Sequence, residues 1–95
     1  MKEADIEDAL LEGTECAGGF CIKLPAIWYT GIPDRLLLLP GGRAVFVELK
    51  RPVGGRMGRL QPWWRDQLQR LGFRWVLLKT VEEVKAFFDA EAPSP

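Results

Sequence analysis

The sequence predicts an α/β domain with the element order α-β-β-β-α-β-α, in which helices pack on a mixed sheet. Short apolar runs bounded by glycine and proline indicate strands, whereas longer segments with apolar residues at helical spacing indicate helices. The chain has 95 residues, 47% of them hydrophobic, which suits one small globular domain. We expect this domain to span residues 1–92, followed by a frayed tail at 93–95.

The first helix is predicted over residues 3–14, where apolar residues recur at helical spacing before glycines end it. A short strand is expected over residues 20–24. A loop bounded by prolines covers residues 25–33, and we expect its two large aromatic side chains, Trp28 and Tyr29, to be packed.

A hairpin is predicted in the middle of the chain. The apolar run at residues 36–39 is too short for a helix and indicates a buried strand. Pro40, Gly41, Gly42 and Arg43 form a strong turn signal, and residues 44–50 read as the returning strand.

After a glycine-rich loop, a helix is predicted over residues 59–71. Its buried stripe is expected to consist of Leu60, Trp64, Leu68 and Leu71. Residues 73–78 read as the last strand, and Thr80 with Glu83 forms a capping box for a final helix.

Composition excludes several functions. The chain has no histidine, and Cys16 and Cys21 are its only cysteines, so His-based catalysis and a Cys/His zinc cluster are excluded. Two cysteines without a disulfide framework suit a reducing cytoplasm, and no apolar run approaches membrane-spanning length, so no membrane partner is expected. The net charge is zero, but acids gather in residues 1–15 and bases in residues 50–79, a split that suits a polyanionic partner.

An acid pair and a lysine surround the hairpin. Glu48 and Lys50 share one face of their strand, with Cα atoms about 6.5–7 Å apart, and hairpin pairing places Asp34 opposite Glu48 or Leu49. Two such close carboxylates repel each other unless a divalent cation binds between them, which favours metal-dependent phosphodiester hydrolysis. Alternatively, Asp34 is a turn-flanking residue, and Glu48 and Lys50 form a surface ion pair worth about 0–1 kcal/mol.

These residues resemble a known motif. Pro33-Asp34 followed by Glu48-Leu49-Lys50 resembles the PD-(D/E)XK nuclease signature. GIPDR, a glycine-rich turn, FVELKRP and a glutamine-bearing helix, in this order, are similar to the stand-alone virus-type replication-repair nuclease (VRR-NUC) domain of phage and prophage proteins. The resemblance covers nearly the whole chain and implies a restriction-endonuclease-like core.

The resemblance also implies roles for individual residues. Asp34 and Glu48 would bind Mg²⁺ or Mn²⁺ together with the backbone carbonyl of Leu49, and Lys50 would be the catalytic lysine. Gln61 matches a family glutamine near the site, although it also suits an ordinary position at the start of a helix.

Further residues are expected around this site. The family carries a metal-facing glutamate on its first helix, for which Glu7 is favoured over Glu3, one turn away. Arg35 alternates to the opposite face of its strand, where we expect an ion pair. The residues expected to hold DNA phosphates are Arg51, Arg56 and Arg59. Core or dimer packing, rather than base stacking, is expected for Trp63, Trp64 and Trp75.

By resemblance, the protein is expected to be a homodimeric endonuclease that resolves four-way (Holliday) DNA junctions in the cytoplasm of a bacterium carrying the phage or prophage. Two alternatives stay open. One is a dimeric DNA-binding module without catalysis, and the other is a different nuclease activity, such as that of a flap nuclease, an exonuclease or an RNA-directed enzyme.

Overall fold

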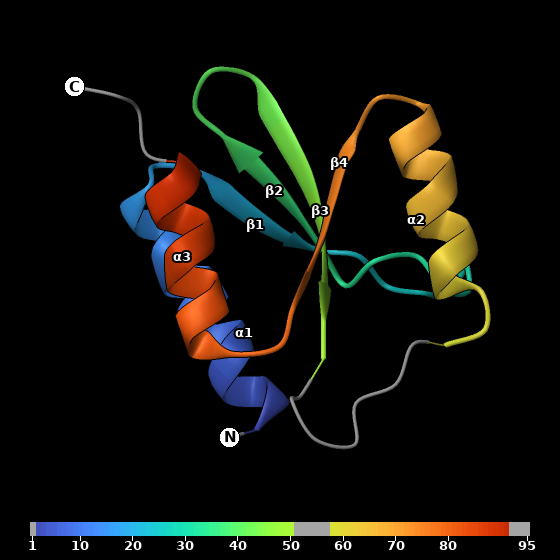
Figure 1. Ribbon diagram of the computed structural model, residues 1–95, viewed down its shortest axis with the longest axis horizontal. Coiled ribbons are helices and arrows are strands. Elements are labelled where there is room, and N and C mark those ends of the chain that lie inside the picture. The colour runs from blue at the N-terminus through green and yellow to red at the C-terminus, as the bar shows by residue number, and fades with distance from the viewer. Residues whose placement is uncertain (1, 51–57, 92–95) are drawn as a thin grey trace.

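The computed structural model describes residues 2–50 and 58–91. The elements follow in the predicted order: α1 (Glu3–Cys16), β1 (Phe20–Lys23), β2 (Arg35–Leu39), β3 (Arg43–Leu49), α2 (Gln61–Arg70), β4 (Arg74–Leu78) and α3 (Val81–Glu91). The strands form one sheet in the order β1-β2-β3-β4, antiparallel except for the parallel β3–β4 pair. Helices α1 and α3 lie together on one side of the sheet and α2 lies on the other (Figure 1). The predicted mixed-sheet α/β class is therefore confirmed.

The β2–β3 hairpin sets the register on which the site depends. Its turn contains Gly41 and Gly42 with φ angles of 85° and 73°, in the left-handed region that glycine enters without steric cost. The pairs run from Leu39 with Arg43 to Arg35 with Val47. One step further along the same ladder, Asp34 lies across from Glu48, one of the two partners that the sequence predicted.

The hydrophobic core lies between the sheet and the α1–α3 layer. Strand alternation sends every second residue of β2 and β3 into this layer and the intervening residues, including Phe46 and Glu48, to the α2 side. The buried cluster consists of Ile6, Leu10, Leu37, Leu39, Val45, Val47, Leu49, Leu78 and Val84. Each large aliphatic side chain buried here stabilises the fold by about 1.5–3 kcal/mol.

The two core helices approach each other closely at Gly13. A Cβ added there would lie 2.4 Å from Cε2 of Phe88 on α3, so this position admits only glycine unless the Phe88 ring shifts. Helix α1 continues through Gly13 and ends at Cys16, two residues beyond its predicted end. The capping box of α3 is confirmed, because Thr80 Oγ1 accepts from Glu83 N and Glu83 Oε1 accepts from Thr80 N.

The predicted buried stripe of α2 was largely wrong. Leu68 is buried, but Leu60 and Leu71 are 42% and 59% exposed. The physical reason is that α2 packs on β4, at the edge of the sheet, so the ends of its apolar stripe extend past the strands. Within residues 2–50 and 58–91, no helix is both long and apolar enough to cross a membrane.

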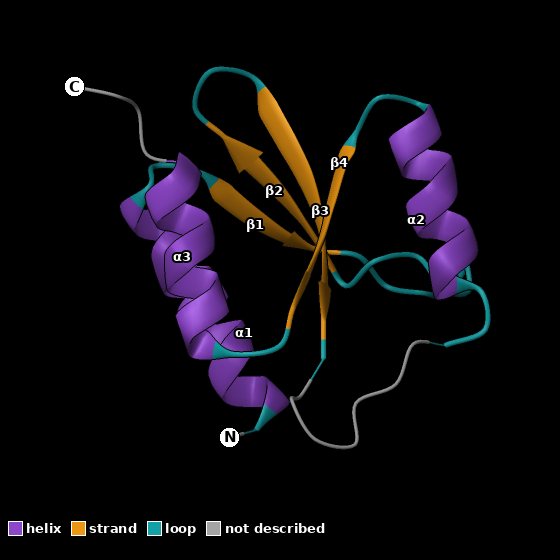
Figure 2. Cartoon of the chain, in the orientation of Figure 1, coloured by secondary structure: helices purple, strands orange, loops and turns teal. Residues whose placement is uncertain are grey.

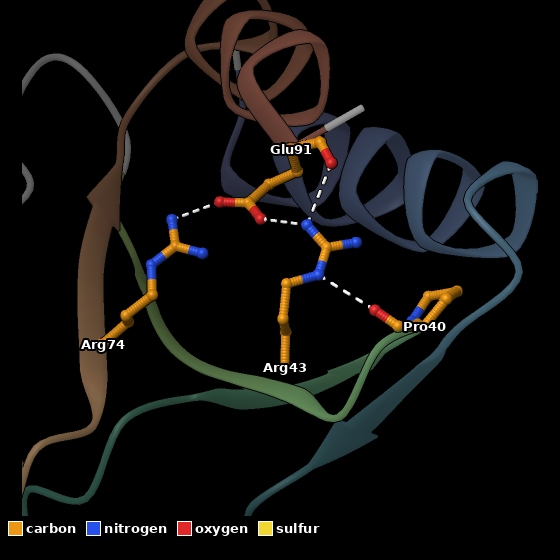
Figure 3. A network of polar contacts seen from close by, with 4 residues as sticks. All are labelled: Pro40, Arg43, Arg74 and Glu91. Atoms are coloured by element: carbon orange, nitrogen blue, oxygen red, sulfur yellow. Dashed lines mark hydrogen bonds and ion pairs between the residues drawn. The ribbon is translucent and has the colours of Figure 1, made fainter. Parts of the chain in front are cut away.

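An arginine–glutamate network ties the end of α3 to the sheet (Figure 3). Arg43 Nη1 lies 2.6 Å from Glu91 Oε2, Arg43 Nε donates to Pro40 O at 2.9 Å, and Arg74 pairs with the other Glu91 oxygen. The two guanidinium groups, Arg74 first, hold the pKa of Glu91 below its usual range. Beside this network, the ends of α1 and α3 and the β2–β3 turn border a pocket of about 700 Å³, at the far end of the hairpin from Asp34.

We expect Glu91→Gln to lower the free energy of unfolding by about 1–2 kcal/mol at pH 7, because the substitution removes the negative charge that pairs with Arg43 and Arg74 at a partly exposed site. Because the folded-state pKa of Glu91 is depressed, its contribution is present above the unfolded value near 4.5 and is lost as the pH falls through the folded value. Urea unfolding at pH 7 and pH 3 measures both effects. Asp89→Asn, at an exposed position of the same helix, is the control, and an equal loss from both variants at pH 7 would contradict the assignment.

Candidate active site

Asp34 is held at the end of β2 by two backbone contacts. Its Oδ2 accepts a hydrogen bond from Leu49 N at 2.8 Å, and its carbonyl accepts one from Leu24 N at 2.9 Å. Buried Pro33 precedes it and fixes the backbone that enters the strand. The hairpin partner thus positions the Asp34 carboxylate directly.

Glu48 is fully buried, with 0% of its surface exposed. Its Oε1 accepts a hydrogen bond from Gln61 Nε2 and lies 3.4 Å from Lys50 Nζ. Its Oε2 is also buried but has no hydrogen-bond partner among the described residues. One carboxylate oxygen therefore accepts a hydrogen bond from Gln61 and pairs with Lys50, whereas the other has no partner among the described residues.

The environment of Glu48 strongly disfavours an unpaired negative charge. Burial, followed by the negative charge of Asp34, raises the pKa of Glu48 to about 8, and the ammonium of Lys50 opposes this only in part. A bound cation would remove both causes of the raised pKa, because it would neutralise the charge inside the protein and screen the two carboxylates from each other.

The residues present fit a divalent metal with few protein ligands. No group of three or more His, Cys, Asp or Glu side chains is gathered anywhere in the part of the chain that the structure describes. The available donors are therefore the carboxylates of Asp34 and Glu48, joined by the carbonyl of Leu49, which we expect to point to the same side as its N–H. Mg²⁺ commonly binds through one or two carboxylates and completes its shell with waters and substrate phosphates.

Gln61 is the first residue of α2, and two hydrogen bonds hold its side chain at the site. Gln61 Oε1 accepts a hydrogen bond from Gly58 N while its amide nitrogen donates to Glu48. Pro62 occupies the first turn, where its missing N–H costs nothing. The predicted proximity of Gln61 to the acid pair is thus what the structure shows.

The β1–β2 loop is anchored to the same end of α2. Gly31 has a φ of 87°, and a Cβ added to it would lie 2.6 Å from Cβ of Leu60. Trp64 Nε1 donates to Thr30 O at 3.0 Å. Figure 2 shows the loop, in teal, passing from the sheet to the foot of α2. The segment that leads into Asp34 and the helix that carries Gln61 therefore form one packed unit.

The structure does not bring Glu7 to the acid pair. Its carboxylate forms an ion pair with Arg35, whose side chain leaves β2 on the α1 side of the sheet and is 8% exposed. The ion pair predicted for Arg35 is confirmed, and Glu48 lies on the opposite face. Glu3 is exposed in the first turn of α1. A metal-binding role for either glutamate stays a prediction.

Aromatic residues near the site differ from the expectation. Trp28 and Tyr29 were predicted to be packed, but they are 85% and 60% exposed. Their loop lies against the start of α2, outside the sheet, so no core layer is available to cover them. Trp64 and Tyr29 pack edge to face, with ring centroids 5.7 Å apart, and Trp63 is 53% exposed. Residues 27–29 are large and apolar but follow neither strand nor helix periodicity, and this pattern could have indicated an exposed loop.

The basic residues expected to hold phosphates are only partly described. Arg59 is exposed immediately before α2, close in sequence to Gln61. Arg51 and Arg56 lie outside the described residues. Trp75 is half-buried on the α2 side, and the guanidinium of Arg65 lies over its ring, 5.8 Å from the centroid. Trp75 thus has a packing role, as expected.

Two comparisons bear on this arrangement. The chain is 38% identical over 52 residues to a protein of Acyrthosiphon pisum secondary endosymbiont phage 1 named "Putative nuclease p44", a match that covers 55% of this chain and 56% of the phage protein. This chain therefore aligns with little more than half of that relative. No protein-family model matches the sequence.

A solved structure described as "VRR_NUC domain" superposes with a TM-score of 0.85 at 23% sequence identity, covering 95% of this chain and 97% of the other. At this level of identity the superposition establishes the fold. The resemblance noted in the motifs is thus confirmed as a likeness of the whole backbone: the chain has the fold of a VRR-NUC domain.

We expect Glu48→Gln to stabilise the metal-free protein at alkaline pH. The folded-state pKa of Glu48, about 8, lies above its usual value of 4.5. Its contribution to stability is therefore fully present below pH 4.5 and is lost as the pH rises through 8. The neutral isostere escapes this loss, so at pH 9 in EDTA it should exceed the wild type by a few kcal/mol, about 1.4 per pKa unit.

Urea unfolding of both proteins between pH 5 and pH 9 provides the measurement. Glu82→Gln, at an exposed position on α3, should follow the wild-type curve throughout. If the Glu48→Gln and wild-type curves run parallel over this range, the carboxylate does not carry the buried charge assigned to it.

Proposed function

We propose that this protein is a divalent-metal-dependent nuclease that hydrolyses phosphodiester bonds in DNA. The observation that carries this proposal is the buried Glu48 carboxylate, with one oxygen held by Gln61 and Lys50, the other without a partner, and Asp34 across the hairpin. A fully buried carboxylate oxygen without a hydrogen-bond partner costs about 1–3 kcal/mol or more, and a bound cation would offset this cost.

The side chains divide the chemistry among themselves. Asp34 and Glu48 would hold Mg²⁺ or Mn²⁺, which when bound polarises a phosphoryl oxygen and makes a coordinated water more acidic. Lys50, whose side chain is 16% exposed and pairs with Glu48, would stabilise the negative charge that develops on the phosphate during attack by water. Gln61 donates to Glu48 Oε1 and would thereby hold the carboxylate in an orientation that leaves Oε2 available to a metal.

The proposed substrate is branched DNA, with a four-way junction favoured, and the proposed acting form is a homodimer. The fold and the name of the phage relative support a nuclease, and the motif resemblance supports the small junction-cutting type. Two copies related by a twofold axis would present two sites to opposed strands of a junction. Exposed Arg59 beside α2 would contribute a phosphate contact that positions DNA without reading its sequence.

Substitution of the site residues should abolish cutting but preserve binding. We expect Asp34→Asn, Glu48→Gln and Lys50→Ala each to slow cleavage by about 10²–10³-fold or more, because each removes charge that acts in the transition state. Gln61→Ala should give a smaller loss, since it acts through the position of Glu48. Cleavage of labelled DNA with Mg²⁺, Mn²⁺ or EDTA provides the readout, and electrophoretic mobility shift measures binding.

Glu82→Gln serves as the control, because its carboxylate is exposed on α3, away from the hairpin end. Unchanged cutting by Glu48→Gln would contradict the site assignment. Tight binding of DNA by the wild type, without cutting under any metal, would instead favour the binding-module alternative.

A second experiment addresses the substrate and the dimer. Four-way junction, flap, linear duplex and single strand of matched length are compared with Mn²⁺ present. We expect paired, symmetric nicks in the junction and weaker cutting of the linear duplex. Light scattering at the assay concentration should give twice the mass of one chain, and a monomer that cuts only flaps or ends would reassign the substrate.

A further inference from the structure

The β1–β2 loop presents an unusual apolar surface to solvent. Ile27 and Trp28 are 77% and 85% exposed, the two highest values among the exposed large hydrophobic side chains of the described residues. Leaving an indole in water forgoes the burial of roughly 150–250 Å² of surface. Contiguous apolar patches that are exposed to solvent commonly mark interaction or ligand-binding sites.

Contacts with α2 hold the loop that carries this surface. Tyr29 O accepts a hydrogen bond from Ile32 N at 3.1 Å, and the Tyr29 ring packs against Trp64, which itself contacts Trp63 with centroids 5.2 Å apart. Together with the Trp64–Thr30 hydrogen bond, these contacts fix the loop on α2. Trp28 therefore lies next in sequence to residues that are fixed on α2, the helix whose first residue, Gln61, donates to Glu48.

The chemistry of the loop points to a flat, uncharged binding partner. Residues 25–33 read PAIWYTGIP and contain no charged side chain, so the loop has no cationic group that could form an ion pair with a phosphate. Nucleobases offer a π-face on which an indole can stack, whatever the base sequence. In continuous duplex DNA both faces of each base are covered by its neighbours. A free face exists at a branch point, a strand end or an unpaired base.

We propose that Trp28 stacks on an exposed base face at a discontinuity in the DNA and thereby places the neighbouring phosphodiester bond at the Asp34–Glu48 site. This proposal rests on the nuclease function proposed above and deepens it. It gives the protein a means of selecting DNA structure rather than sequence, because the indole finds a partner only where the helical stack is interrupted.

The test measures binding in the inactive Glu48→Gln background, so that cleavage does not intervene. A four-way junction and a continuous duplex of equal length carry 2-aminopurine, beside the branch point or at the matching position. We expect Trp28→Ala to weaken junction binding roughly 5- to 150-fold and to abolish the 2-aminopurine signal of restacking. Duplex binding should change little, and Trp28→Phe should retain most of the affinity.

Phe20→Ala provides the matched control. Phe20 is 73% exposed and aromatic but pairs with Leu38, near the turn end of the hairpin and far from Asp34, so its removal should leave junction affinity unchanged. Light scattering is run on every variant, because a second copy of this chain is the rival occupant of the loop. A dimer that dissociates only on Trp28→Ala would overturn the stacking proposal.

The remaining outcomes separate this proposal from the nuclease function. If the wild type cuts DNA but Trp28→Ala binds the junction as tightly as its parent, stacking is refuted and the nuclease stands. If the wild type cuts nothing but Trp28→Ala loses junction binding selectively, the base contact is supported and the catalytic assignment fails. An absence of any DNA binding by the wild type would overturn both.

Discussion

A fully buried carboxylate near the end of a central strand is the constraint around which this small protein is organised. Glu48 could not be held there in its charged form by packing alone, because desolvation of an unpaired carboxylate costs several kcal/mol. The protein offsets part of this cost with Gln61 and Lys50, both on the same oxygen. The other Glu48 oxygen, Oε2, has no hydrogen-bond partner among the described residues, and Glu48 projects from the same face of the sheet as Asp34. The arrangement is completed most simply by a divalent cation.

Three structural features in other parts of the chain position these side chains. The double-glycine turn fixes the hairpin register, and a slip of one residue would send Glu48 to the α1–α3 side of the sheet. The parallel pairing of β3 with β4 requires a crossover connection, and that connection contains α2, which delivers Gln61. The approach of Gly31 to Leu60 then joins the loop before Asp34 to the same helix. The site is therefore assembled from parts that also hold the fold together.

Local chemistry made much of this predictable from the sequence. Strand alternation and the turn glycines were enough to place Asp34 across from Glu48 or Leu49, and the capping box marked the start of α3. The predictions failed where tertiary placement decides burial. The apolar stripe of α2 was predicted to be buried, but the helix lies at the edge of the sheet. Trp28 was predicted to be packed because it is large and apolar, but its own segment does not show whether another layer covers it. The pairing of Glu7 with Arg35 likewise depends on which face of the sheet α1 covers, which periodicity does not fix.

The most direct test of this account is anomalous diffraction at the manganese edge from crystals soaked with Mn²⁺ at neutral pH. The account predicts a peak about 2.0–2.2 Å from Glu48 Oε2 and from a carboxylate oxygen of Asp34, with Gln61 and Lys50 still on Glu48 Oε1. The peak should vanish in Glu48→Gln. A clean map with no peak there at saturating manganese, or with metal bound only at the Arg43–Glu91 end of the molecule, would contradict it.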